Sequence, residues 1–91
     1  MIEFEFYAEA DGSLHIRKHH VSEEEIDEAF NEHDYLWHKR KDGSFIALSK
    51  LESGRYLEII FRKLQPDLYF IITAYDVEDP NLINRMEQEL S

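Results

Sequence analysis

The alternation of apolar and polar positions is clearest in two neighbouring runs in the second half of the chain. Residues 55–62 and 68–75 are rich in β-branched and aromatic side chains, and a Gln-Pro-Asp turn separates them. Two such runs around a turn predict a β-hairpin at the centre of a sheet. One face of this hairpin is apolar and must be covered, and it carries Leu57, Ile59, Phe61, Leu68, Phe70, Ile72 and Ala74. The other face can meet water or a ligand, and it carries Tyr56, Glu58, Ile60, Arg62, Tyr69, Ile71, Thr73 and Tyr75.

Three further runs predict the strands that complete this sheet. Residues 3–7 alternate between polar and apolar side chains, which is typical of an edge strand. Residues 35–40 and 44–50 flank an Asp-Gly pair, the usual turn of a two-residue hairpin. The last four strands therefore follow one another as a meander.

Two helices have clear start signals in the sequence. Ser22 and Glu25 form a capping box at the start of a helix over residues 23–31. A proline directly after Asp79 begins a C-terminal helix, whose apolar stripe should lie on the apolar face of the sheet. Residues 13–19 fit either a strand or a short helix, and their pattern does not decide between the two.

Together these elements predict an α+β fold, a small antiparallel sheet of four to five strands with two to three helices packed on one face. A length of 91 residues supports a single domain, residues 1–91. The chain has no cysteine, no apolar run as long as a membrane span, and no secretion signal at its start. We therefore expect a cytoplasmic protein that does not bind a membrane.

The charge of the chain changes which partners are expected. Ten basic residues face twenty acidic ones, which gives a net charge of −10. Such a charge disfavours broad, non-specific nucleic-acid binding, which depends on neutralising phosphates. All five histidines nevertheless lie between His15 and His38, next to basic residues at 17–18 and 39–41. A basic patch on an acidic body therefore stays compatible with the sequence.

Three segments, residues 20–29, 54–61 and 72–74, resemble the BrnT-like toxins of the RelE superfamily. They correspond to a Val-Ser-x-Glu-Glu helix start, a Gly-Arg-x-Leu strand entry, and an Ile-Thr-Ala strand end that precedes a terminal helix. The resemblance covers the chain from Phe4 to about Arg85, with the segments in the family's order and spacing.

This resemblance implies a RelE-like fold, a helix over residues 13–19, cleavage of RNA, and a cognate antitoxin that covers the active face. The chain departs from the family at one place. Typical members continue with a basic residue after the Ile-Ser-Ala segment, whereas here Tyr75 follows, and then Asp76, Glu78 and Asp79. A catalytically weakened relative is therefore the alternative within the family.

Cleavage of RNA without a metal ion needs a base, an acid and cations that stabilise the charge on phosphorus. The catalytic candidates are His20, Glu58, Arg62 and Tyr75. The candidates for RNA binding are Lys18, His38, Lys39, Arg40, Arg55 and Tyr69. Each candidate also has a structural interpretation: packing at the helix entry for His20, a cross-strand ion pair with a basic residue for Glu58, cross-strand packing for the tyrosines, and solvated surface charge for the others.

A metal site has little support in the sequence. His15 and His19 are four positions apart and could share one face of a helix, but no third ligand follows at a suitable spacing. We therefore expect no metal ion and no cofactor.

Two hypotheses about function follow. The first is an endoribonuclease toxin of a toxin–antitoxin pair, or a weakened relative, that binds RNA on the open face of the sheet. The second is a non-enzymatic module that binds a protein on the same face. In either case, the exposed first strand could pair with a second copy and form a homodimer.

Overall fold

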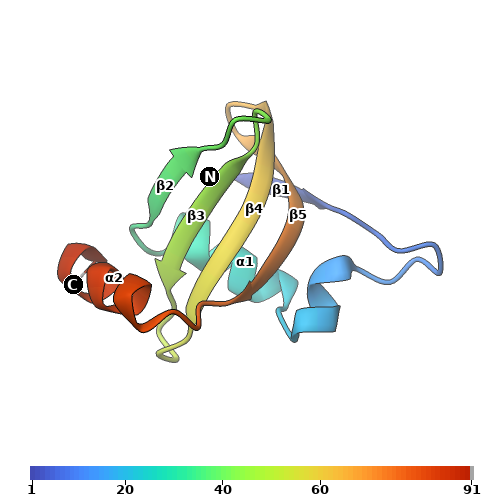
Figure 1. Cartoon of the computed structure of the whole chain (residues 1–91). Helices are drawn as coiled ribbons and strands as arrows, with labels where there is room; N and C mark the ends of the chain where they lie inside the picture. The colour runs from blue at the N-terminus through green and yellow to red at the C-terminus, as the bar shows by residue number, and fades with distance from the viewer. Residues whose placement is uncertain (91) are drawn as a thin grey trace.

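The central hairpin predicted from the sequence is present. The computed structural model describes residues 1–90, and in it β4 (Tyr56–Gln65) and β5 (Leu68–Asp76) pair antiparallel (Figure 1). β3 (Phe45–Lys50) lies beside β4, and β2 (Leu36–Lys39) lies beside β3, both in antiparallel register. These four strands form the predicted meander.

β1 (Glu3–Phe6) is the exception to the predicted antiparallel sheet, because it runs parallel to β5. The five-stranded sheet has the order β1-β5-β4-β3-β2 and is therefore mixed. The expectation of a wholly antiparallel sheet was wrong for this strand, since alternation within a strand does not fix the direction in which a distant strand pairs with it. β1 does lie at the edge of the sheet, and its pairing with a second copy stays a prediction.

Three helical segments accompany the sheet, which confirms the α+β class. They are the 3₁₀-helix η1 (His15–His19), α1 (Glu23–Asn31) and α2 (Pro80–Leu90). The predicted capping box is present: Ser22 Oγ accepts a hydrogen bond from the Glu25 amide at 3.1 Å, and the Glu25 carboxylate accepts one from the Ser22 amide at 3.0 Å. None of the helices in residues 1–90 is long and apolar enough to cross a membrane.

α1 covers the first face of the sheet and forms the main core with it. Its buried side chains are Ile26, Ala29 and Phe30, and the strand residues beneath it include Leu57, Ile59 and Phe61. All of these are almost fully buried. Burial of each large apolar side chain stabilises the fold by roughly 1.5–3 kcal/mol, so this layer supplies most of the core energy.

α2 lies against the opposite face of the sheet, where Met86 packs with Leu48 and Val77. The prediction that both helices cover one face was therefore wrong. The reason lies in β3, whose opposite face carries the apolar side chains Ile46 and Leu48, which also need cover. Tyr56 packs in this second cluster and is not part of an open surface.

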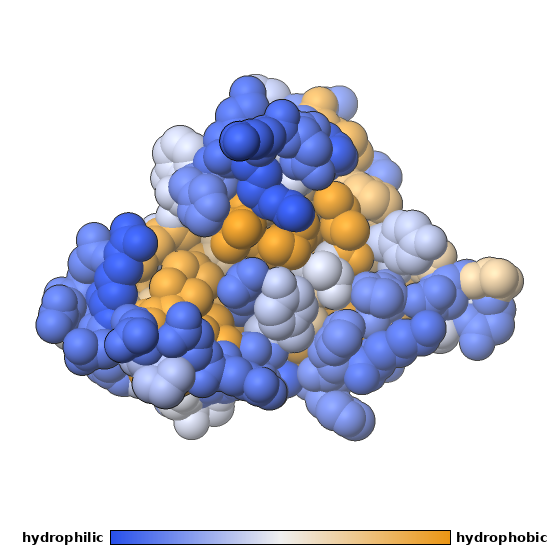
Figure 2. All heavy atoms as spheres, in the orientation of Figure 1, coloured by the Kyte–Doolittle hydropathy of each residue, from blue (hydrophilic) through white to orange (hydrophobic). Residues whose placement is uncertain are grey.

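α2 covers only the part of this second face that β2 and β3 form (Figure 1). We call the uncovered remainder, which carries Glu58 and Tyr75, the open face. Figure 2 shows exposed apolar side chains in the middle of this side of the molecule, with hydrophilic groups around them. Phe70, which lies opposite Arg62, is half-buried on this face.

A β-bulge in β5 changes which side chains reach the open face. Ile60 lies opposite Thr73, but Phe61 lies opposite Ile71, so Ile72 has no partner. On the far side of the bulge the alternation is inverted, and Tyr69 faces α1. The prediction that Tyr69 binds RNA on the open face was therefore wrong, because a bulge leaves no mark in simple alternation.

The buried position of Tyr69 can be tested by substitution. Tyr69 is 5% exposed, and the ring centroids of Phe61 and Phe30 lie 4.9 and 5.4 Å from its own. We expect Tyr69→Ala to lower the free energy of unfolding by about 3–5 kcal/mol, as measured by urea denaturation. Trp37→Ala is the control, because Trp37 is 58% exposed and its loss should cost much less. Equal effects of the two substitutions would contradict the inverted register.

Candidate functional site

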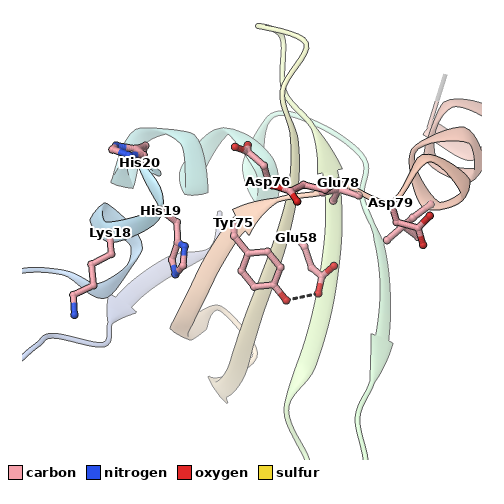
Figure 3. A pocket seen from close by; sticks show the side chains of 10 residues that line it. Lys18, His19, His20, Glu58, Tyr75, Asp76, Glu78 and Asp79 are labelled. Carbon is pink, nitrogen blue, oxygen red and sulfur yellow. Dashed lines mark hydrogen bonds between the residues drawn. The ribbon is translucent and has the colours of Figure 1, made fainter.

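A hollow of about 510 Å³ lies at one end of the open face, between η1, the end of β5 and the start of α2 (Figure 3). Three separate segments bring side chains with proton-transfer chemistry to it. We call this hollow the reaction pocket, and its lining includes Lys18, His19, His20, Glu58, Tyr75 and Asp76. Four of the ten predicted site residues thus line it, namely Lys18, His20, Glu58 and Tyr75.

Glu58 and Tyr75 form the closest polar pair in the pocket. They are direct neighbours across β4 and β5, and the Tyr75 hydroxyl donates a hydrogen bond of 2.6 Å to Glu58 Oε2. Burial, followed by the hydrogen bond and the charge of Glu58, raises the pKa of Tyr75 to about 12. Tyr75 is therefore a neutral hydrogen-bond donor near pH 7 and not a base.

His19 approaches this pair from η1. Its ring centroid lies 5.9 Å from that of Tyr75, and Figure 3 shows the imidazole between Lys18 and Tyr75. Lys18 Nζ lies 3.2 Å from Glu9 Oε1, outside the pocket. Alternation and capping signals give no reason to choose His19 over its neighbour, because the side-chain directions in a single 3₁₀ turn follow from tertiary contacts.

His20 lines the pocket, but its side chain points away from Tyr75 (Figure 3). Its backbone has a φ of 59°, the left-handed conformation that ends η1. This conformation turns the chain towards α1 and leaves the His20 carbonyl free to accept a hydrogen bond from Arg55. His20 therefore shapes the entry of α1, which matches its structural interpretation.

Arg55 ties together three segments beside the pocket, namely the end of η1, the start of α1 and the end of β5. Its guanidinium donates to the carbonyls of His20 and His19 at 2.7 and 3.1 Å, to Glu25 Oε1 at 2.9 Å, and to Asp76 Oδ1 at 2.5 Å. The hydrogen bond to Asp76 is the main cause that raises the pKa of Arg55. With its donors engaged in this way, Arg55 acts as a positioning residue rather than as the predicted RNA contact.

The other predicted residues lie away from the pocket. Arg62 donates to the Asp42 carbonyl at 3.2 Å, and Arg40 donates to Ser44 Oγ at 3.5 Å, both beside the turn between β2 and β3. Lys39 lies over the ring of Phe45. His38 lines a smaller hollow of about 200 Å³ beside α2. The predicted catalytic set is thus divided, because Arg62 belongs to the hairpin end of the sheet.

The pocket contains more negative than positive charge. Asp76, Glu78 and Asp79 line it in addition to Glu58, against Lys18 and two histidines. Within residues 1–90, no group of three or more His, Cys, Asp or Glu side chains is arranged to hold a metal ion. Lys18 is the fixed positive charge among the lining residues, and its ammonium pairs with Glu9.

Comparison with known proteins adds no assignment. A scan against protein-family models finds no match. Searches of curated proteins and of solved structures also find no match. The resemblance to BrnT-like toxins, and the RelE-like identity of the fold, therefore stay predictions from the sequence.

The pairing of Glu58 and Tyr75 predicts how Tyr75 titrates. Its phenol should stay protonated at about pH 10, where an ordinary tyrosine is half ionised. Glu58→Gln removes the negative charge that opposes ionisation, so the pKa of Tyr75 should fall. NMR of labelled tyrosine rings measures both, with Tyr75→Phe to assign the signal. Titration of Tyr75 near pH 10 in the unsubstituted protein would contradict the hydrogen bond.

The role of Arg55 predicts a loss of stability when its geometry changes. Arg55→Lys keeps the charge, but one ammonium cannot reach acceptors on three segments at once. We expect the free energy of unfolding to fall by about 1.5–3 kcal/mol, and the amides of residues 18–20 to exchange hydrogen faster. Arg17→Lys is the matched control, because Arg17 is exposed and, within residues 1–90, forms an ion pair with Glu23 alone. If the Arg55→Lys and Arg17→Lys proteins have the same free energy of unfolding, Arg55 is not a positioning residue.

Proposed function

We propose that this chain is a cytoplasmic endoribonuclease of the BrnT-like type, which cleaves RNA in the reaction pocket and is restrained by an antitoxin protein. The observation that carries the proposal is the meeting of Glu58, Tyr75 and His19 in one hollow. These residues come from three segments that are distant in the sequence, and together they offer a base, a hydrogen-bond donor and an acid. That is the minimal set for cleavage by the 2′-hydroxyl of RNA.

In this proposal, the Glu58 carboxylate takes the proton of the 2′-hydroxyl. The 2′-oxygen then attacks phosphorus, and the bond from phosphorus to the 5′-oxygen breaks. His19 in its protonated form gives its proton to that 5′-oxygen. The products are a 2′,3′-cyclic phosphate and a free 5′-hydroxyl, so no co-reactant is needed.

The remaining pocket residues stabilise the charge on phosphorus. Lys18 supplies a positive charge once its ammonium leaves Glu9. The Tyr75 hydroxyl, which is released from Glu58 when that carboxylate takes up a proton, supplies a neutral hydrogen bond in place of the basic residue of typical BrnT-like toxins. Hydrogen bonds from neutral donors are about half as strong as charge-assisted ones. We therefore expect slow turnover, in keeping with a weakened member of that family.

A protein-interaction module is the second candidate, and the distribution of charge favours it. The chain has a net charge of −10, and six of its ten basic residues already form ion pairs with carboxylates. The apolar surface in the middle of the open face also suits a protein partner (Figure 2). Expression without a partner separates the two functions, because an active nuclease should arrest growth and a module should not.

Purified protein should cleave RNA and leave 2′,3′-cyclic ends. Glu58→Gln and His19→Asn each remove a proton-transfer group, so each should reduce kcat by about 10²–10⁴-fold. Tyr75→Phe should also lower kcat, because it removes the hydrogen-bond donor at the phosphorus. Single-turnover assays with a labelled oligonucleotide measure these effects.

His20→Asn is the matched control for His19→Asn. Asparagine tolerates the left-handed backbone at this position, and the His20 ring points away from Tyr75. Cleavage should therefore survive in His20→Asn. Absence of cleavage in the unsubstituted protein, or cleavage that is indifferent to both Glu58→Gln and His19→Asn, rejects the proposal.

A further inference from the structure

Four aromatic and imidazole rings form a continuous row that ends at the reaction pocket. The ring centroids of Tyr7 and His15 are 5.8 Å apart, those of His15 and His19 are 5.4 Å apart, and those of His19 and Tyr75 are 5.9 Å apart. We call these four residues the ring row. They come from the segment after β1, from η1 and from β5, so the row is a product of the fold.

The ring row is accessible from solvent. Tyr7 is 46% exposed, and His19 is exposed as well. A second hollow, of about 340 Å³, adjoins the outer half of the row and is lined by Tyr7, Glu9, His15, Lys18 and Ile72. Lys18 lines both this hollow and the reaction pocket, so the two are neighbours. Nearly half of the Tyr7 surface is therefore open to a ligand.

We infer that the ring row binds the unpaired bases of single-stranded RNA and leads the strand into the reaction pocket. Proteins hold single strands by stacking bases on aromatic side chains beside a cation that contacts the backbone. The ring row supplies the stacking surfaces, and Lys18 supplies the cation. A duplex keeps its bases stacked inside, so it cannot use such a row. This inference rests on the proposed function, because it names the substrate of the same pocket.

Glu9 holds the polar part of the row in place. Its Oε1 lies 2.5 Å from His15 Nδ1 and 3.2 Å from Lys18 Nζ, and the hydrogen bond with His15 is the main cause that lowers the pKa of Glu9. Lys18 must leave this carboxylate to contact a phosphate. The row should therefore bind a single strand with modest affinity. The slope of log K against log salt should correspond to one neutralised phosphate.

The test measures binding separately from cleavage. The probe is a labelled RNA strand roughly eight nucleotides long, whose 2′-hydroxyls are methylated so that they cannot attack phosphorus. Fluorescence anisotropy measures its binding. We expect Tyr7→Ala to weaken binding by roughly 5- to 150-fold, the range for loss of one base–aromatic stack. Lys18→Gln should reduce the slope of log K against log salt by about 0.7. A duplex of the same sequence should bind more weakly than the single strand.

Trp37→Leu is the matched control, because Trp37 is an exposed aromatic residue outside the row. Its binding should equal that of the unsubstituted protein. Equal losses for Tyr7→Ala and Trp37→Leu, equal binding of duplex and single strand, or no binding at all would overturn the inference. If the protein binds the methylated strand but does not cleave ordinary RNA, the nuclease function is rejected and the RNA-binding role of the ring row is kept. Cleavage whose KM is unchanged by Tyr7→Ala rejects the ring row and keeps the nuclease.

Discussion

The arrangement of the pocket depends on the guanidinium of Arg55. Its donors reach the carbonyls that end η1, the carboxylate at the start of α1, and Asp76 at the end of β5. Only a planar group with several fixed donors can join these segments at the same time. The result is that the backbone carrying Lys18 and His19 is held beside Tyr75, although these residues lie more than fifty positions apart in the sequence.

The parts of the fold that could be predicted from the sequence are those set by local signals, and the parts that could not depend on contacts between distant segments. Capping by Ser22, the Asp-Gly pair and the alternation in β4 are local signals, and they predicted α1, the β2–β3 hairpin and β4. The turn of that hairpin is one residue longer than predicted, since Arg40 pairs with Ser44. The side of the sheet that α2 covers is not local, since β3 is apolar on both faces and α2 fits the second one. The parallel pairing of β1 and the bulge at Ile72 also depend on contacts between distant segments.

The same distinction applies to the candidate site. Glu58 and Tyr75 were predicted on the same face of the sheet, and this is correct because no bulge lies between them and the end of β5. Tyr69 lies beyond the bulge and was therefore predicted on the wrong face. The choice between His19 and His20 depends on a single left-handed residue, which the sequence does not mark. Predictions from alternation thus hold for regular strands and fail where one residue interrupts the register.

The proposal that single-stranded RNA occupies the reaction pocket on the open face can be tested directly. The most direct test is an NMR titration of the labelled protein with an uncleavable strand, followed by mapping of the amide shifts. The account predicts shifts concentrated at residues 18–19, 58 and 75, with few at the turn between β2 and β3. Shifts centred on that basic turn, or shifts spread without preference over the surface, would contradict it.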